Sequence, residues 1–158
     1  MKLSTKGRYA VMAMVDLATQ SQGTPIALAD VAQRQEISLS YLEQLFGKLR
    51  RSGLVYSVRG PGGGYRLARS AAETRVSDII IAVDESIKAT RCATGSPQGC
   101  HTSKGRCLTH DLWEELGNNI FLYLNGISLE DVVERRILGT SGHAYHQRAR
   151  DSASLAAE

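Results

Sequence analysis

Residues 37–68 read ISLSYLEQLFGKLRRSGLVYSVRGPGGGYRLA, and this stretch decides the fold. Its first half carries apolar residues at helical spacing, namely Leu42, Leu45, Phe46 and Leu49. Gly53 follows a run of cations, which is typical of the residue just beyond the end of a helix. The first half therefore predicts a helix that ends shortly before Gly53.

The second half of the stretch predicts a β-hairpin. Short strands at 54–58 and 65–68 flank a glycine-rich tip at 59–64. Upstream, the apolar spacing predicts a helix over about 28–35, which a turn of three residues separates from the next helix. Two helices, a tight turn and a hairpin make a winged helix-turn-helix, so we expect a mostly α fold with a β-hairpin wing.

The second helix of this unit would enter the major groove of DNA, because that groove admits one α-helix. The candidate contact residues on it are polar: Ser38, Ser40, Tyr41, Glu43, Gln44 and Lys48. Gln44 suits adenine, and Glu43 suits the amino group of cytosine. The spacing leaves a second role open for Glu43, because Ser40-x-x-Glu43 also matches a helix capping box. A tyrosine such as Tyr41 more often packs than contacts a base, and Lys48 suits a phosphate.

The hairpin tip offers a further DNA contact. Arg59 begins the tip and is followed by residues with almost no side chains, so it could enter a narrow minor groove, whose negative potential attracts arginine. The charge distribution agrees: residues 1–75 hold eleven Lys/Arg and five Asp/Glu, a net charge of +6, whereas residues 76–158 have a net charge of −3. The pattern GxxxxGK[ST] is absent, which argues against a nucleotide-binding loop.

All three cysteines of the chain lie in one segment, Cys92-x7-Cys100-x6-Cys107-x2-His110. The stretches between them, ATGSPQG and HTSKGR, are polar and cannot become ordered by burying apolar surface. Three thiols and an imidazole can order such a segment around a metal. We therefore expect a metal site formed by Cys92, Cys100, Cys107 and His110.

The spacing of these ligands leaves the metal open. Three cysteines and one histidine are a known structural zinc set, although zinc sites usually have shorter gaps. Long glycine-rich gaps leave room for an iron–sulfur cluster, which cysteines commonly hold. Three thiols without a metal are a further alternative, disfavoured because buried thiols rarely lie in a polar loop.

A long helix is predicted from about Thr109 to Leu124, before the breaking pair 125–126. It carries one apolar stripe made of Leu112, Trp113, Leu116, Ile120 and Leu124. The stripe is too large for a lone exposed helix, so the helix either packs on the N-terminal domain of its own chain or pairs with a second copy. Small helix-turn-helix proteins usually read palindromic sites as two-fold dimers, which favours the second copy. We expect two copies of the chain to form a homodimer through this helix.

The expected organisation is a DNA-binding domain over 1–75, a cluster-binding loop with dimerisation helices over 76–138, and a disordered tail over 139–158. Ser77 is predicted to cap a helix over 78–86. No apolar run approaches the length of a membrane span, and the start does not resemble a signal peptide, so no membrane partner is expected. Without a signal peptide the expected location is the cytoplasm, where thiols stay reduced, and the odd number of cysteines argues against a disulfide framework.

Several segments together resemble the IscR family of bacterial iron–sulfur cluster regulators. They are LSTKGRYAVMAMVDLA, ISLSYLEQLFGKLRRSGLV, SVRGPGGGYRLAR, AVDESIKATRC and CLTHDLW. The resemblance runs from residue 1 to about residue 138. It implies a homodimeric repressor and activator that controls iron–sulfur cluster assembly genes and receives its cluster from the assembly machinery.

The resemblance also implies roles for particular residues. A [2Fe–2S] cluster would be held by Cys92, Cys100, Cys107 and His110. DNA contacts would fall on Ser38, Ser40, Tyr41, Glu43, Gln44 and Arg59. Glu43 would take part in a change of DNA-site choice between the apo and cluster-bound forms.

Three other functions remain as alternatives. A related regulator that senses nitric oxide through a [4Fe–4S] cluster would not need His110 as a ligand. A zinc-stabilised DNA-binding module would keep the winged helix without sensing. A redox enzyme is the least favoured, because the chain shows no nucleophile–base pair and no second cofactor motif.

Overall fold

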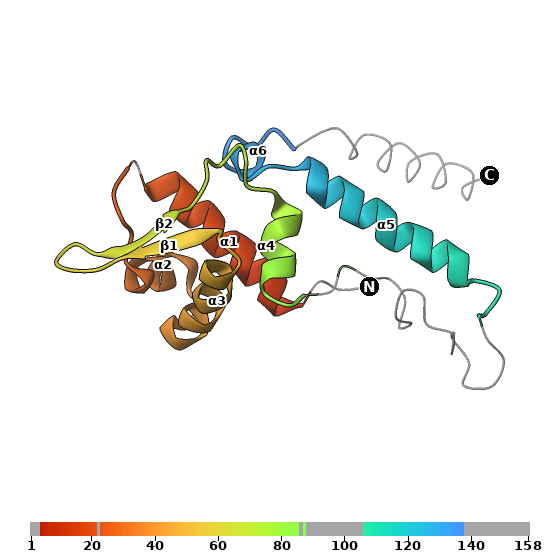
Figure 1. The fold of residues 1–158 in the computed structure, drawn as a ribbon, viewed down its shortest axis with the longest axis horizontal. Coiled ribbons are helices and arrows are strands. Elements are labelled where there is room, and N and C mark those ends of the chain that lie inside the picture. Colours follow the sequence, from red (N-terminus) through yellow and green to blue (C-terminus); the bar gives the residue numbers. More distant parts are fainter. Residues whose placement is uncertain (1–3, 22, 86, 88–105, 138–158) are drawn as a thin grey trace, which may run out of the picture.

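The computed structural model describes residues 4–21, 23–85, 87 and 106–137. This part of the chain forms helices α1 to α6 and an antiparallel hairpin of strands β1 and β2, which follows α3 and precedes α4 along the chain (Figure 1). The predicted fold, mostly α with a β-hairpin wing, is confirmed. No helix in these ranges is both long enough and apolar enough to cross a bilayer.

Helices α2 (Leu28–Gln35) and α3 (Leu39–Arg51) form the helix-turn-helix. In the turn between them, Glu36 adopts a left-handed backbone conformation (φ 53°), and the next residue, Ile37, is buried. Gly53 also has a positive φ (71°), and its N–H donates to the carbonyl of Arg50 (3.1 Å). Gly53 therefore ends α3 as predicted, since glycine adopts this conformation without strain.

The wing consists of β1 (Val55–Val58) and β2 (Gly64–Leu67), paired from Val55↔Leu67 to Val58↔Gly64. Ile26, from the segment before α2, extends the hairpin by exchanging two backbone hydrogen bonds with Tyr65 (2.8 and 3.0 Å). Gly64 lies against the backbone of Ile26, which leaves no room for a Cβ there. Gly64 is thus needed where the wing meets the segment before α2, in addition to the glycines of the hairpin turn.

The core lies between α1 (Thr5–Gln20) and the helix-turn-helix. The side chain of Ser4 caps α1 by accepting a hydrogen bond from the N–H of Lys6 (3.2 Å). Phe46 of α3 is fully buried and meets Tyr65 of the wing edge-on, with ring centroids 4.9 Å apart. The largest fully buried side chains of the core include Met14, Leu17, Leu42, Leu45, Leu49 and Ile79.

Helix α4 (Val76–Ala82) differs from the prediction at both ends. Its N-cap is Arg75, and Ser77 lies inside the helix, so the predicted cap at Ser77 is wrong. The Ser77 side chain is buried and donates to Asn125 Oδ1 (3.0 Å). The sequence does not distinguish the two roles, because a serine hydroxyl can cap a helix or form a hydrogen bond with a distant residue.

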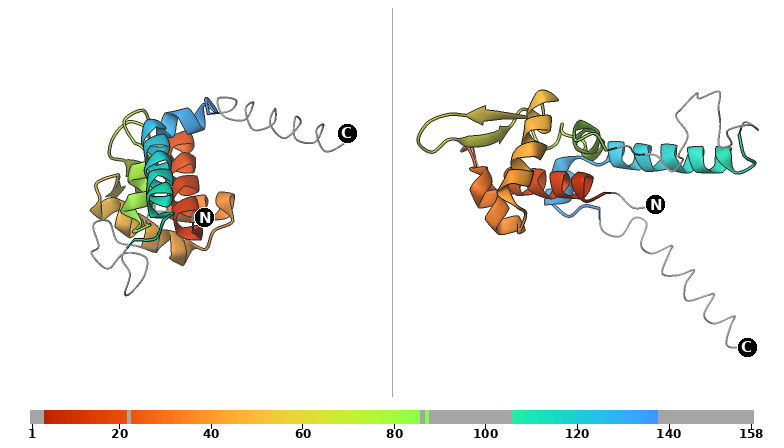
Figure 2. Two further views of the ribbon diagram at one scale, coloured as in Figure 1. Left: turned by 90° about the vertical axis from the view of Figure 1, so that its right-hand side faces the viewer. Right: turned by 90° about the horizontal axis from the view of Figure 1, so that it is seen from below.

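Helix α5 (His110–Gly126) projects from the rest of the described fold, and its N-terminal end lies farthest from α1 to α4 (Figures 1 and 2). It begins after Thr109, as predicted, and continues through Gly126 instead of ending at the predicted break. Helix α6 (Leu129–Val133) follows, with a capping box between Ser128 and Asp131. The boundaries at residues 75 and 138 stay predictions, and the predicted disordered tail lies outside the described residues.

Candidate DNA-binding face and metal centre

One side of α3 is fixed in the core, which presents its other side outward. Leu42, Leu45, Phe46 and Leu49 are each no more than 2% exposed. Ser40, Glu43 and Gln44 lie on the opposite side and are exposed. Helix α2 packs against α3 and fixes its orientation. The outward side of α3 therefore offers these polar side chains to a partner outside the fold.

Ser38, and not Ser40, caps α3. Its hydroxyl oxygen accepts a hydrogen bond from the N–H of Tyr41 (3.2 Å), and its backbone is extended. Ser40 lies inside the helix, so the Ser40–Glu43 capping box is wrong as an interpretation of the spacing. Glu43 is left exposed without that capping role, and the base-reading interpretation of Glu43 stays a prediction.

Tyr41 and Lys48 are engaged within the fold. Tyr41 is half-buried, and its ring meets Tyr9 of α1 edge-on, with centroids 6.1 Å apart. The Lys48 ammonium lies 2.7 Å from a carboxylate oxygen of Asp84, just beyond α4. The sequence pattern did not indicate this ion pair, because its partners are far apart along the chain.

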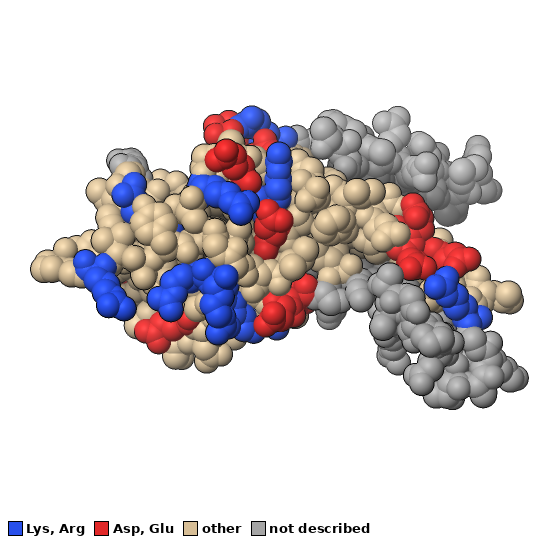
Figure 3. All heavy atoms as spheres, in the orientation of Figure 1, with Lys and Arg blue, Asp and Glu red and all other residues tan. Residues whose placement is uncertain are grey.

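Arg59 is exposed at the start of the hairpin tip, where Gly60 and Gly62 have positive φ angles. The wing also holds a second cation, which is not among the predicted contact residues: Arg66 lies 6.0 Å from the ring centroid of its cross-strand partner Tyr56. Lys and Arg side chains gather over the helix-turn-helix and the foot of the wing (Figure 3). This face suits a polyanion.

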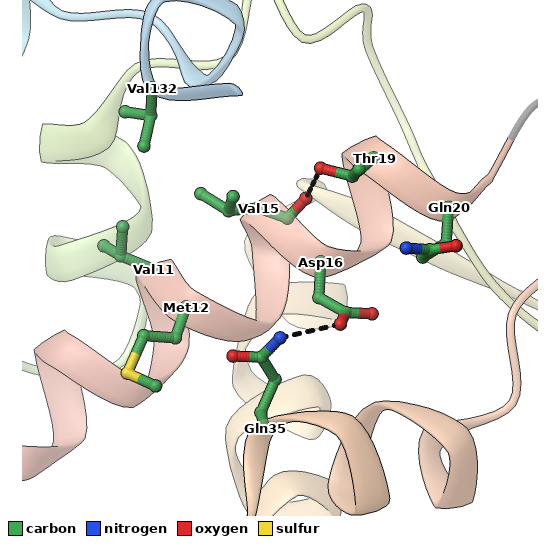
Figure 4. Close-up of a pocket in the computed structure, with 8 residues that line it drawn as sticks. All are labelled: Val11, Met12, Val15, Asp16, Thr19, Gln20, Gln35 and Val132. Carbon is green, nitrogen blue, oxygen red and sulfur yellow. Dashed lines mark hydrogen bonds between the residues drawn. The ribbon is translucent and has the colours of Figure 1, made fainter. Parts of the chain in front are cut away.

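A surface hollow of about 340 Å³ lies beside α1, and Val11, Met12, Val15 and Val132 are among its lining residues (Figure 4). At its edge, the buried carboxylate of Asp16 accepts hydrogen bonds from the Arg34 guanidinium (2.6 Å) and from Gln35 (2.8 Å). Burial by itself would raise the pKa of Asp16, but the hydrogen bonds from Arg34 and Gln35 and the charge of Arg34 outweigh it and lower that pKa. The group ties α1 to α2 and has a structural role.

Two of the four predicted ligands lie within the described residues: Cys107 lies in the turn just before α5, and His110 is the first residue of α5. The N–H of His110 donates to the carbonyl of Cys107 (3.0 Å), so the two side chains leave the backbone within one turn. His110 is 5% exposed, and Cys107 Sγ lies 3.5 Å from Thr109 Oγ1. Cys92 and Cys100 lie outside the described residues. A thiol and an imidazole are ligand types that suit a soft or borderline metal, and the chain brings these two residues into one turn.

The turn after His110 adds a carboxylate outside the predicted ligand set. Glu114 Oε2 lies 3.3 Å from His110 Nε2, and Asp111 brings a further carboxylate within 4.8 Å of the same group. The i,i+4 spacing of His110 and Glu114 could have indicated this contact. A carboxylate at this distance can orient a ligating imidazole.

The predicted apolar stripe of α5 is largely uncovered in a single chain. Leu112, Trp113 and Leu116 are 62%, 45% and 39% exposed, whereas Ile120 and Leu124, nearer to α4, are half-buried. Phe121, Leu122 and Tyr123 are also exposed. An apolar surface of this size on one helix is typical of an interface.

The family comparison agrees with this geometry. The model of the Rrf2 family, described as iron-dependent transcriptional regulators, matches residues 3–135. The chain belongs to the Rrf2 family. Like other Rrf2 proteins it is a winged-helix, DNA-binding transcription regulator, and it is not an enzyme.

Individual Rrf2 relatives cover most of this chain. It is 52% identical to the HTH-type transcriptional regulator IscR of Photorhabdus laumondii over 151 residues, which are 95% of this chain and 90% of that protein. It is 55% identical to IscR of Xenorhabdus nematophila over 86% of this chain and 81% of that protein.

Solved structures of Rrf2 proteins share the fold. The IscR of T. potens matches with a TM-score of 0.69 and 35% identity, over 92% of this chain and 96% of that one. The cysteine regulator CymR of B. subtilis matches with a TM-score of 0.70 and 31% identity, over 85% of this chain and 98% of that one. The resemblance to the IscR family is therefore confirmed.

Proposed function

We propose that this Rrf2 regulator is a homodimer that senses a [2Fe–2S] cluster and controls iron–sulfur cluster assembly genes, as repressor and activator. The observation that carries the proposal is the turn shared by Cys107 and His110 at the start of α5. The same helix exposes the apolar stripe that suits a dimer. A metal-dependent change at this turn would therefore arise beside the dimer surface.

The cluster would be held by Cys92, Cys100, Cys107 and His110. Cysteine thiolates are the usual cluster ligands, and one imidazole among them raises the reduction potential relative to four thiolates. When bound, the cluster supplies a redox-active link between the cysteine segment and α5. The thiols need a reducing compartment, so a cytoplasmic location and the cluster assembly machinery as donor belong to the proposal.

The DNA partner is a palindromic promoter site, because a two-fold dimer presents two copies of α3. Ser38, Ser40, Tyr41, Glu43 and Gln44 would read the major groove, with Lys48 on a phosphate. Arg59 would enter the minor groove from the wing. Cluster gain or loss would shift the population of DNA-binding conformations, and Glu43 would help to select the site.

The first experiment is a visible absorption spectrum, with iron and sulfide analysis, on the full chain purified without oxygen. Visible absorption with about two irons and two sulfides per chain would support the [2Fe–2S] proposal. About four irons and four sulfides per chain would favour the nitric-oxide-sensing relative. A colourless protein with tightly bound zinc would leave the DNA-binding function and remove cluster sensing.

Variants then test the ligands. Cys107→Ala and His110→Ala should each lower the iron content and change the visible spectrum without changing the helix content by circular dichroism. Leu108→Ala is the matched control, since Leu108 lies between the two ligands and is fully exposed. An unchanged spectrum in both ligand variants would contradict the assignment.

A further inference from the structure

Asp84 and Glu85 form a junction at the end of α4. Asp84 has a positive φ (57°), and its N–H donates to the carbonyl of Ile81 (3.0 Å). The N–H of Glu85 donates to the carbonyl of Ile80 (3.3 Å). Cys92 follows Glu85 by seven residues, so this junction is where the chain leaves the DNA-binding fold for the cysteine segment.

The beginning of α1 holds this junction in place. The N–H of Ser4 donates to Glu85 Oε1 (3.0 Å), and the Ser4 hydroxyl binds the other oxygen of the same carboxylate. Lys6 Nζ donates to the backbone carbonyl of Asp84 (3.3 Å). The Glu85 side chain also packs close to Gly7, where a Cβ would lie 3.3 Å from its Cγ.

Through Asp84 the junction also holds α3. Asp84 Oδ2 lies 2.7 Å from Lys48 Nζ, and the Lys48 side chain is 28% exposed whereas that of Asp84 is 75% exposed. The hydrogen bond and charge of Lys48, followed by the charges of Lys6 and Arg51, lower the pKa of Asp84. Asp84 is therefore an anion at neutral pH, fixed against a cation of the DNA-reading helix.

We propose that Asp84 competes with DNA phosphate for the ammonium of Lys48, so the junction before the cysteine segment controls how many cations α3 offers to DNA. A lysine that stays paired with a carboxylate does not neutralise a phosphate, so it displaces no condensed cation from the DNA and adds less to binding. An exposed pair of this kind is weak, which allows DNA to displace Asp84. The inference rests on the proposed placement of α3 on DNA.

The test compares Asp84→Asn with the unmodified full chain. Asparagine has nearly the same size and tolerates a left-handed backbone, so the junction is preserved. Binding to a mixed-sequence duplex of about 30 base pairs is measured by fluorescence anisotropy across a salt series. We expect D84N to bind several-fold more tightly at low salt, with a salt slope steeper by about 1 per bound subunit.

Two further variants assign the effect to Lys48. In a Lys48→Gln background, D84N should give no gain, because the contested ammonium is absent. Asp78→Asn removes one negative charge from α4, at a residue that lines a small surface hollow together with Asp84, and no ion pair of Asp78 occurs within the described ranges. An equal gain from D78N, or a gain that survives in the K48Q background, would overturn the proposal in favour of a general charge effect.

Arg59→Ala separates this inference from the proposed DNA face. If R59A weakens binding and D84N changes nothing, the competition at Lys48 is disproved and the DNA face stands. If neither variant changes binding, DNA does not occupy this face, and both proposals fail. A gain in D84N that depends on Lys48 supports the competition.

Discussion

At the scale of single residues, Asp16 carries the polar contact between α1 and α2. Its carboxylate is almost fully buried, and Arg34 approaches it with two nitrogens of the guanidinium. Asp16 interrupts the apolar side of α1, and nothing in the spacing indicates that it is buried. Its partners became visible only when the tertiary fold brought α2 against α1.

We predict that Asp16→Asn lowers the free energy of unfolding by about 2 kcal/mol at neutral pH, since hydrogen bonds to a charged group are lost. Because folding lowers the pKa of Asp16, its stabilisation is complete above the unfolded-state pKa and is lost as the pH falls through the folded-state pKa. The difference between wild type and D16N should therefore shrink below about pH 4. Urea unfolding across a pH series measures it, with exposed Asp30→Asn as the control.

Glu43 gives the second prediction at this scale. Because Ser38 is the cap of α3, Glu43→Ala should leave the helix intact and change which sequences are bound more than how tightly. Selection from a random duplex pool should show discrimination reduced by about tenfold at the affected base pair. Glu36→Asn, which removes a charge outside α3, should leave the preference unchanged. Equal loss of affinity on all sequences would contradict base reading.

At the scale of elements, the sequence patterns of a few neighbouring residues predicted those helix ends and strands that depend on local interactions. The end of α3 at Gly53 and both strands of the wing follow from backbone preferences of a few neighbouring residues. Contacts with a distant partner are what these local patterns do not contain, and the wrong cap at Ser77 is one result. Ser77 binds Asn125 on α5, and Lys48 binds Asp84 beyond α4, and no pattern within one element contains that information.

The wing carries the prediction for this scale. Arg59 is exposed at the tip of a hairpin that Ile26 and Phe46 attach firmly to the fold, so the tip is presented at a fixed place. We expect Arg59→Ala to weaken DNA binding and reduce the salt slope by about 1 per bound subunit. Anisotropy titrations over a salt series measure this. An unchanged slope would show that Arg59 meets neither a phosphate nor the minor groove.

At the scale of the whole molecule, the described fold has a compact basic part and a projecting helix (Figures 2 and 3). The sequence predicted both parts, because each has its own pattern of residues. The basic part has apolar residues at helical spacing together with an excess of cations, and the projecting helix has a continuous apolar stripe. The arrangement of the metal ligands was less predictable. Only the turn containing Cys107 and His110 is described, and the approach of Glu114 to that turn depends on helical geometry that begins there.

The last prediction concerns the dimer. We expect Leu116→Glu to shift the protein toward a single chain, because it places a charge in the middle of the apolar stripe of α5 where a second copy would bury it. Size-exclusion chromatography with light scattering at several protein concentrations measures the mass. Asn118→Glu is the matched control, since Asn118 is exposed on the same helix about 200° around its axis from Leu116. Circular dichroism distinguishes dissociation from unfolding. A folded L116E dimer with the mass of the wild type would show that α5 does not hold the two copies together.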